Sequence, residues 1–177
     1  RAQELISERL QTLDRVAALL NAPIAEMEAR LESLLTSHHA LQKDMEKAQR
    51  KLAQAQFTEL LAQVQTVKGV PVLTAQIEGV DVDTLREMTD WFKDKVGSGT
   101  AVLATVNNGK PIIIAAVTDD LIKRGIKAGD IVREVAKMVG GGGGGRPNLA
   151  QAGGKDASKL PEALAHVAVL VADNLKD

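Results

Sequence analysis

The sequence predicts an α+β protein, in which a long helical hairpin or coiled coil precedes a small α/β domain with a mixed sheet flanked by helices. Two observations predict this organisation. Apolar residues recur at helical spacing through residues 1–66, and all fifteen glycines of the 177-residue chain lie after that segment. We therefore place a domain boundary at residue 66, with a helical arm over 1–66 and a globular domain over 67–177.

The helical arm contains two predicted helices. The first ends before Asn21-Ala22-Pro23, where Asn21 can cap a second helix and Pro23 suits its first turn. In the second helix apolar positions alternate by three and four residues, which is the pattern of a coiled-coil seam, and a new stripe begins at Phe57. Over 24–65 this helix would measure roughly 60 Å, too long for a compact domain to bury. We expect a homodimer contact, or a contact with a segment outside this chain, through Met27, Leu31, Leu34, Leu41, Met45 and Leu52.

The pattern changes after residue 67. Strands are predicted over 70–77, 101–106 and 111–117, with a short extended piece over 148–152. Helices are predicted over 81–96, 128–139 and 161–175. Residues 112–117 are apolar on both faces of the predicted strand, which favours a central position in a covered sheet.

Composition excludes several classes of protein. The net charge of −1 excludes a globally basic nucleic-acid binder, and the absence of cysteine excludes disulfides and thiolate chemistry. No apolar run approaches the ~20 residues that cross a bilayer. We therefore expect a cytoplasmic protein without a membrane segment. The chain begins without Met, inside a predicted helix, so we expect a piece of a longer protein.

Metal and acid–base sites find little support in the residue pattern. His38 and His39 are adjacent on a helix and point about 100° apart, so they cannot share one ion. Asp81 and Asp83, and likewise Asp119 and Asp120, precede predicted helices, where carboxylates commonly cap the free N–H groups. We predict neither a metal site nor a catalytic site in this chain.

The most distinctive segment is a run of six glycines, residues 140–145, followed by Arg146-Pro147-Asn148. A nucleotide P-loop needs Gly-Lys-Ser/Thr after its glycines, which is absent here. Two interpretations remain open: a flexible connector, or a tight bend whose N–H groups bind phosphate oxygens. In the second, the cations Arg146 and Lys155 flank the bend, and a local basic patch forms if the loop folds back onto Lys123, Arg124 and Lys127.

The block 140–154, GGGGGGRPNLAQAGG, together with the helices on either side, resembles the end of bacterial alanyl-tRNA synthetases over essentially the whole chain. The resemblance implies a helical dimerisation arm and a globular domain of the kind associated with DHH phosphoesterases. It also implies that this module holds the elbow of alanine-specific tRNA, so that the aminoacylation and editing sites act on one molecule. Carried over by position, the RNA contacts would be Gly141, Gly142, Gly143, Gly144, Gly145, Arg146, Asn148, Gln151 and Lys155, with Lys123, Arg124 and Lys127 from the basic patch.

The resemblance implies no catalysis by this chain alone. In DHH phosphoesterases a histidine typically follows the glycines, and Arg146 stands there instead, which argues against phosphoester hydrolysis. The ATP, Mg and Zn of the alanine–tRNA ligase family belong to regions that this chain lacks, so we expect no cofactor here. Two alternatives remain: a purely structural oligomerisation module, and an accessory substrate-binding domain of the DHH-phosphoesterase type.

Overall fold

The computed structural model describes residues 2–176, which divide into two compact units between Ala48 and Gln49. The division falls inside α2 (Met27–Leu61), earlier than residue 66, because Ala53 and Phe57 near the end of this helix are buried against the globular unit. The predicted new apolar stripe is confirmed, since Leu60, Leu61 and Val64 pack beside Phe57.

The N-terminal unit contains α1 (Ala2–Leu20), the short 3₁₀ helix η1 (Ile24–Glu26) and the first turns of α2. Asn21 ends α1 instead of beginning the next helix. Its φ of 50° lies in the left-handed region that asparagine tolerates, and the N–H groups of Asn21 and Ala22 bond the carbonyls of Ala18 and Ala17. No described helix is long and apolar enough to cross a membrane.

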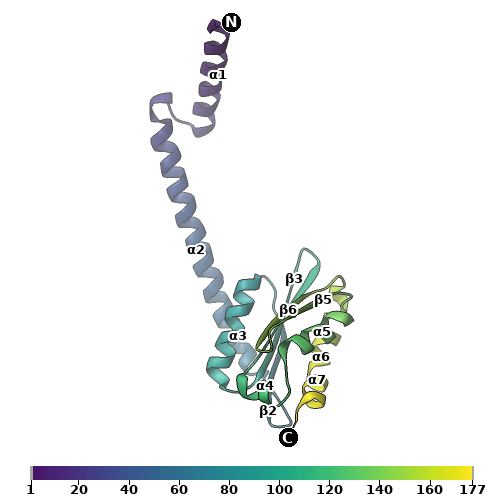
Figure 1. The fold of residues 1–177 in the computed structure, drawn as a ribbon. Helices are drawn as coiled ribbons and strands as arrows, with labels where there is room; N and C mark the ends of the chain where they lie inside the picture. Colours follow the sequence, from purple (N-terminus) through teal and green to yellow (C-terminus); the bar gives the residue numbers. More distant parts are fainter. Residues whose placement is uncertain (1, 177) are drawn as a thin grey trace. The chain divides into compact units, whose positions relative to one another are not determined.

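The globular unit, drawn in teal to yellow in Figure 1, is built on a sheet. This sheet has six strands in the order β1-β2-β3-β4-β6-β5. Only β2 and β3 are parallel, and the other neighbouring pairs are antiparallel, which confirms a mixed sheet. The strands are β1 (Gln65–Val67), β2 (Val70–Gln76), β3 (Thr100–Asn107), β4 (Lys110–Val117), β5 (Gly142–Gly145) and β6 (Leu149–Gly153). The hairpin from β3 to β4 turns at Asn108 and Gly109, both with positive φ, as their sequence predicts.

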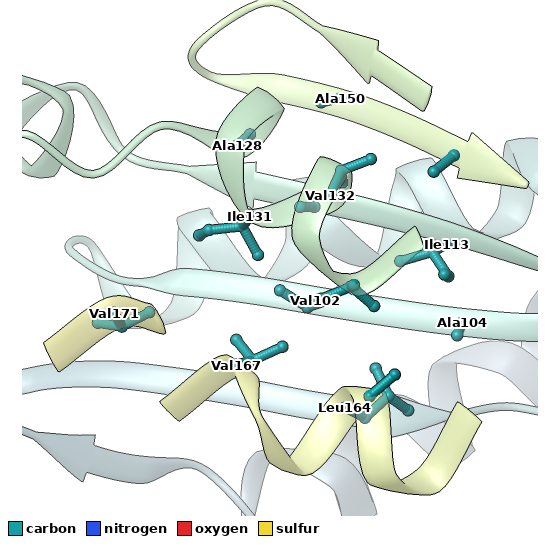
Figure 2. Packing of buried hydrophobic residues seen from close by; sticks show 14 of the residues in the cluster. Val102, Ala104, Ile113, Ala128, Ile131, Val132, Ala150, Leu164, Val167 and Val171 are labelled. Atoms are coloured by element: carbon teal, nitrogen blue, oxygen red, sulfur yellow. The ribbon is translucent and has the colours of Figure 1, made fainter. Parts of the chain in front are cut away.

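Helices cover both faces of the sheet. One face packs on α3 (Val82–Val96) and the end of α2, where Phe92 is fully buried and Trp91 meets the ring of Phe57 edge-on at 5.7 Å. The other face packs on α5 (Ala128–Met138), α6 (Leu160–Ala165) and α7 (Val167–Asn174), as Figure 2 shows around Val102 and Ile113. The β4 segment is buried from both sides, as its continuous apolar run predicts.

Three further elements of the globular unit differ from the sequence-based prediction. A short strand, β1, precedes β2 and turns into it through Lys68 and Gly69, both with positive φ. A five-residue helix, α4 (Asp119–Lys123), follows β4 in a segment to which the sequence-based prediction assigns no helix of its own. The closing helix is interrupted: the 3₁₀ helix η2 (Ala157–Lys159) leads into α6, and His166 separates α6 from α7.

The glycine run is neither a flexible connector nor a tight bend over its whole length, because Gly142–Gly145 form an edge strand paired with β6. The N–H of Arg146 bonds the carbonyl of Leu149 at 2.9 Å, which closes the hairpin around Pro147 and Asn148. In an antiparallel pair, hydrogen-bonded residue pairs alternate with pairs that are not hydrogen-bonded to each other, so this bond determines which pairs are which. Gly143 and Ala152 form a non-hydrogen-bonded pair, the kind in which the two Cα atoms come closer together. The residues of β5 at such positions must therefore allow the backbones of β5 and β6 to approach closely.

The glycines of β5 divide into two kinds. A Cβ on Gly143 would overlap Ala152, and a Cβ on Gly145 would lie 2.6 Å from the Cα of Ala150, so neither position has room for a side chain. A Cβ on Gly142 or Gly144 would meet no atom within 4 Å, and neither residue has positive φ. Packing inside the protein thus requires glycine at alternate positions of β5 only.

This alternation predicts opposite effects of the same substitution on neighbouring residues. Gly143→Ala should lower the free energy of unfolding by about 1–3 kcal/mol, the usual cost of overpacking, because β5 and β6 must separate. Gly144→Ala should leave it unchanged or raise it by about 0.4–1 kcal/mol, because the unfolded chain loses entropy. Chemical denaturation of the two variants and the parent measures both values. Equal destabilisation by the two substitutions would contradict the packing described here.

Candidate nucleic-acid interface

The open edge of β5 presents backbone groups without side chains. Because Arg146 and Leu149 form a hydrogen-bonded pair, the alternation directs the N–H groups of Gly142 and Gly144 toward β6. The N–H groups of Gly143 and Gly145 point away from β6, to the side where no further strand of the sheet pairs. All four residues are exposed. Two N–H donors therefore point outward from β5, and that of Gly145 borders the start of α5, since a Cβ on Gly129 would lie 3.9 Å from the Gly145 nitrogen.

Arg146 and Lys127 lie at the same end of the hairpin. The N–H of Ala128, next to Lys127, bonds the carbonyl of Pro147 at 2.8 Å, so the start of α5 is held against the hairpin turn. Gly129 is also close to the hairpin, since a Cβ there would lie 3.4 Å from the carbonyl oxygen of Gly145. The turn therefore places two exposed cations beside the outward N–H groups of β5.

The other predicted cations lie elsewhere. Lys155 is at the opposite end of the hairpin, where its N–H bonds the carbonyl of Val139 at 2.9 Å. Lys123 ends α4, and the carbonyl of Arg124 accepts the N–H of Lys176, so these two residues lie beside the C-terminal segment. Across residues 2–176, no carboxylate lies within ion-pair distance of Lys123, Arg124, Lys127, Arg146 or Lys155.

Asn148 lies in the turn but faces a different environment. It lines a depression of about 380 Å³ together with Lys93, Asp119 and Asp120. The hydroxyl of Ser98 donates a hydrogen bond to the carboxylate of Asp120, which lowers the pKa of that group and keeps it ionised. Two carboxylates beside one lysine disfavour phosphate, so the depression is a poor part of an RNA surface.

The remaining acidic candidates have structural partners. Asp81 accepts the N–H of Thr84 at 2.7 Å at the start of α3, and this bond lowers the pKa of Asp81. The capping interpretation of Asp81 is confirmed. Asp119 and Asp120 lie in the first turn of α4, but the capping position belongs to Thr118, whose side chain makes no capping bond to the helix. Among the described residues no three His, Cys, Asp or Glu side chains gather as a metal site would require.

Sequence analysis missed one polar residue of this region. Arg86, on α3, donates from Nη2 to Oε1 of Gln151 at 2.7 Å and from Nη1 to Oδ1 of Asp83 at 2.8 Å. Gln151, by contrast, is in the predicted set and lies on β6 directly opposite Gly144. Nothing in the local sequence around Arg86 marks this link, because it joins residues 65 positions apart.

The predicted dimerisation residues lie along α2. In the single chain Leu31, Leu34, Leu41, Met45 and Leu52 are exposed, and Met27 is half-buried. Leu41 is 72% exposed, and it lies in a row of exposed apolar side chains along one helix, which is typical of an interaction surface. His38 and His39 are exposed on the same helix, with ring centroids 6.2 Å apart.

Comparison with known proteins places these features in one family. The chain is 43% identical over 97% of its length to an alanine–tRNA ligase of Roseiflexus sp. (strain RS-1), and 47% identical over 94% of its length to that of Geobacillus thermodenitrificans (strain NG80-2). It spans 19% of the length of each of these relatives. It is also similar to the C-Ala domain of Aquifex aeolicus alanyl-tRNA synthetase, with a TM-score of 0.58 and 28% identity, over 62% of this chain and 97% of that domain.

Residues 69–173, which lie in the globular unit, match the DHHA1 domain family. The match includes the whole β5–β6 hairpin. The predicted resemblance to the C-terminal region of alanyl-tRNA synthetases is confirmed by these relatives and by the C-Ala structure. This chain therefore belongs to the DHHA1 domain family, and over nearly its whole length it is similar to alanine–tRNA ligases.

Proposed function

We propose that this chain is the tRNA-holding and self-associating module of an alanine–tRNA ligase. The observation that carries the proposal is the exposed edge of β5, where the outward N–H groups of Gly143 and Gly145 adjoin Arg146 and Lys127, two cations without an ion-pair partner in the described part of the chain. N–H groups and cations are the partners of phosphate oxygens. The similarity to alanine–tRNA ligases supports tRNA as the polyanion.

The bound region of the tRNA is the elbow, the outer corner of the folded molecule. A hairpin edge with two outward N–H groups and few cations suits a folded shape better than a long stretch of duplex. By holding the elbow, the module keeps one alanine-specific tRNA available to the aminoacylation and editing sites of the complete ligase. The chain itself contributes binding and positioning, without catalytic residues and without a cofactor of its own.

Self-association is the second part of the proposal. Leu31, Leu34 and Leu41 follow the spacing of a coiled-coil seam and stay exposed in the single chain. Burying a leucine side chain stabilises an assembly by about 1.5–3 kcal/mol, so a seam of this length favours pairing. We assign the partner as a second copy, because one seam matches another identical seam in register.

A binding titration tests the RNA contact. With three to five phosphate contacts, the logarithm of the tRNA association constant should fall against the logarithm of salt with a slope of about −3 to −4. Arg146→Ala and Lys127→Ala should each weaken binding at low salt and make that slope shallower by about 0.7–0.9. Lys155→Ala, at the far end of the hairpin, measures how far the RNA extends.

Two controls accompany this titration. Arg133→Ala with Lys137→Ala removes two cations from α5 that already pair with Asp130 and Glu134, so it should leave tRNA affinity nearly unchanged. An RNA duplex of equal charge should bind more weakly than tRNA. Equal affinity for the duplex would exclude recognition of the elbow, and unchanged binding by the Arg146 and Lys127 variants would exclude this edge as the contact.

Polar substitution of the seam tests the pairing separately. Replacing Leu31, Leu34 and Leu41 with glutamine should convert dimers to monomers in light scattering or sedimentation, while the globular unit keeps most of its tRNA affinity. The matched control replaces Ser33, Ser37 and Lys43 with glutamine, on the same helix outside the seam, and should remain dimeric. A parent chain that is monomeric at high concentration would overturn the assignment.

A further inference from the structure

Arg86 occupies an unusual position beside the proposed RNA contact. Its side chain is 46% exposed, yet its guanidinium is held in one orientation by Asp83 on its own helix and by Gln151 on β6. The guanidinium has five N–H donors, and the bonds to Asp83 and Gln151 leave the other three without a partner among residues 2–176. An ordered, half-exposed arginine with open donors is prepared for a ligand, because the entropy of ordering is already lost.

The hairpin next to this arginine has clearance for a flat group. Gln151 lies opposite Gly144, and a Cβ on Gly144 would meet no atom within 4 Å. The next position of β5 on this face, Gly142, is equally open and lies opposite Gly153. β5 therefore has no side chain on the face of the sheet that carries Gln151, and the space beside Gln151 is left open. Packing within the protein does not require glycine at Gly142 or Gly144, so it does not explain this open space.

The charges around Arg86 favour a nucleobase over a phosphate. The carboxylate of Asp83 is 2.8 Å from Nη1 and offsets the charge of the guanidinium. A phosphate would meet this carboxylate as well as the arginine, whereas a nucleobase gains dispersion and cation–π contact from the guanidinium plane. The peptide N–H groups of β5 lie in the plane of the sheet, so this face offers no backbone donors to phosphate oxygens.

We propose that Arg86, oriented by Asp83 and Gln151, stacks its guanidinium plane on an exposed nucleobase of the bound RNA. The inference rests on the proposed tRNA contact. It extends this contact from the edge of the β5–β6 hairpin to the face of the sheet on which Gln151 bonds Arg86. The edge near Arg146 binds the sugar-phosphate backbone, and Arg86 contacts a base. The occupant is a base whose face is uncovered in the folded RNA, since bases inside a continuous stack have no free face.

The salt dependence of binding separates the two kinds of contact. Arg86→Ala should weaken tRNA binding about five- to tenfold, a typical loss for one stacking contact, with an unchanged slope of log affinity against log salt. Arg86→Lys should bind as weakly as Arg86→Ala, because lysine keeps the charge but has no plane. Arg133→Ala is the matched control: Arg133 is an exposed helical arginine that also pairs with an aspartate three residues before it, at 3.0 Å.

A purely structural role for Arg86 gives a different result. If Arg86 only links α3 to β6, its removal lowers the melting temperature and leaves affinity unchanged once the variant is folded. Gly144→Ala provides the second variant, because a methyl group there fills the clearance without touching Arg86. It should keep the melting temperature at or above that of the parent and weaken tRNA binding at constant slope.

Defined outcomes overturn the inference. Parental affinity in both Arg86→Ala and Gly144→Ala excludes this face as an RNA contact. A shallower slope in Arg86→Ala that Arg86→Lys restores identifies a phosphate contact instead of a base. Failure of the parent chain to bind tRNA at low salt is a separate result, which removes the proposed function itself. A parent that binds, with Arg86 variants that bind equally well, removes only the present inference.

Discussion

The close approach of β5 to β6 is the constraint on which the rest of the globular unit depends. Gly143 and Gly145 oppose Ala152 and Ala150 at the positions where antiparallel backbones come nearest, and only glycine leaves space there. The same alanines belong to the core beneath α5. Moving β5 outward would therefore disturb the hairpin turn, the start of α5 and the packing of β6 together.

This constraint also determines what the hairpin can bind. A glycine strand at the edge of a sheet has unpaired N–H groups and no side chains to shield them, which most proteins avoid because such edges aggregate. Here the edge is short, and the cations Arg146 and Lys127 lie beside it. Their repulsion disfavours pairing with another basic edge, and their charge favours an anionic partner.

The distribution of charge follows from the pairing of cations along the helices. On α3 and α5, Lys93, Arg133 and Lys137 each bond a carboxylate three residues earlier. Such exposed pairs add little stability, but they remove positive charge from the field around the helices. The cations near the hairpin turn have no such partners among the described residues, so a chain with a net charge of −1 still has a local positive region.

The sequence by itself determined the features that depend on local spacing. Apolar periodicity indicated the long exposed helix, the buried β4 segment and the new stripe at Phe57, and Asn108-Gly109 indicated the turn between β3 and β4, because each pattern reports on neighbours a few residues away. The family resemblance rested on the block around Arg146 and was confirmed.

Only the tertiary structure decided how the glycine run is used. A run of six glycines shows no alternating pattern in the sequence. Only the pairing with β6 shows that Gly143 has no room for a side chain whereas Gly144 does. It likewise decided which cations share one end of the hairpin, and it joined Arg86 to Gln151 across 65 positions. The physical reason is that strand pairing and ion pairing act through space, and their partners are fixed only when the core has closed.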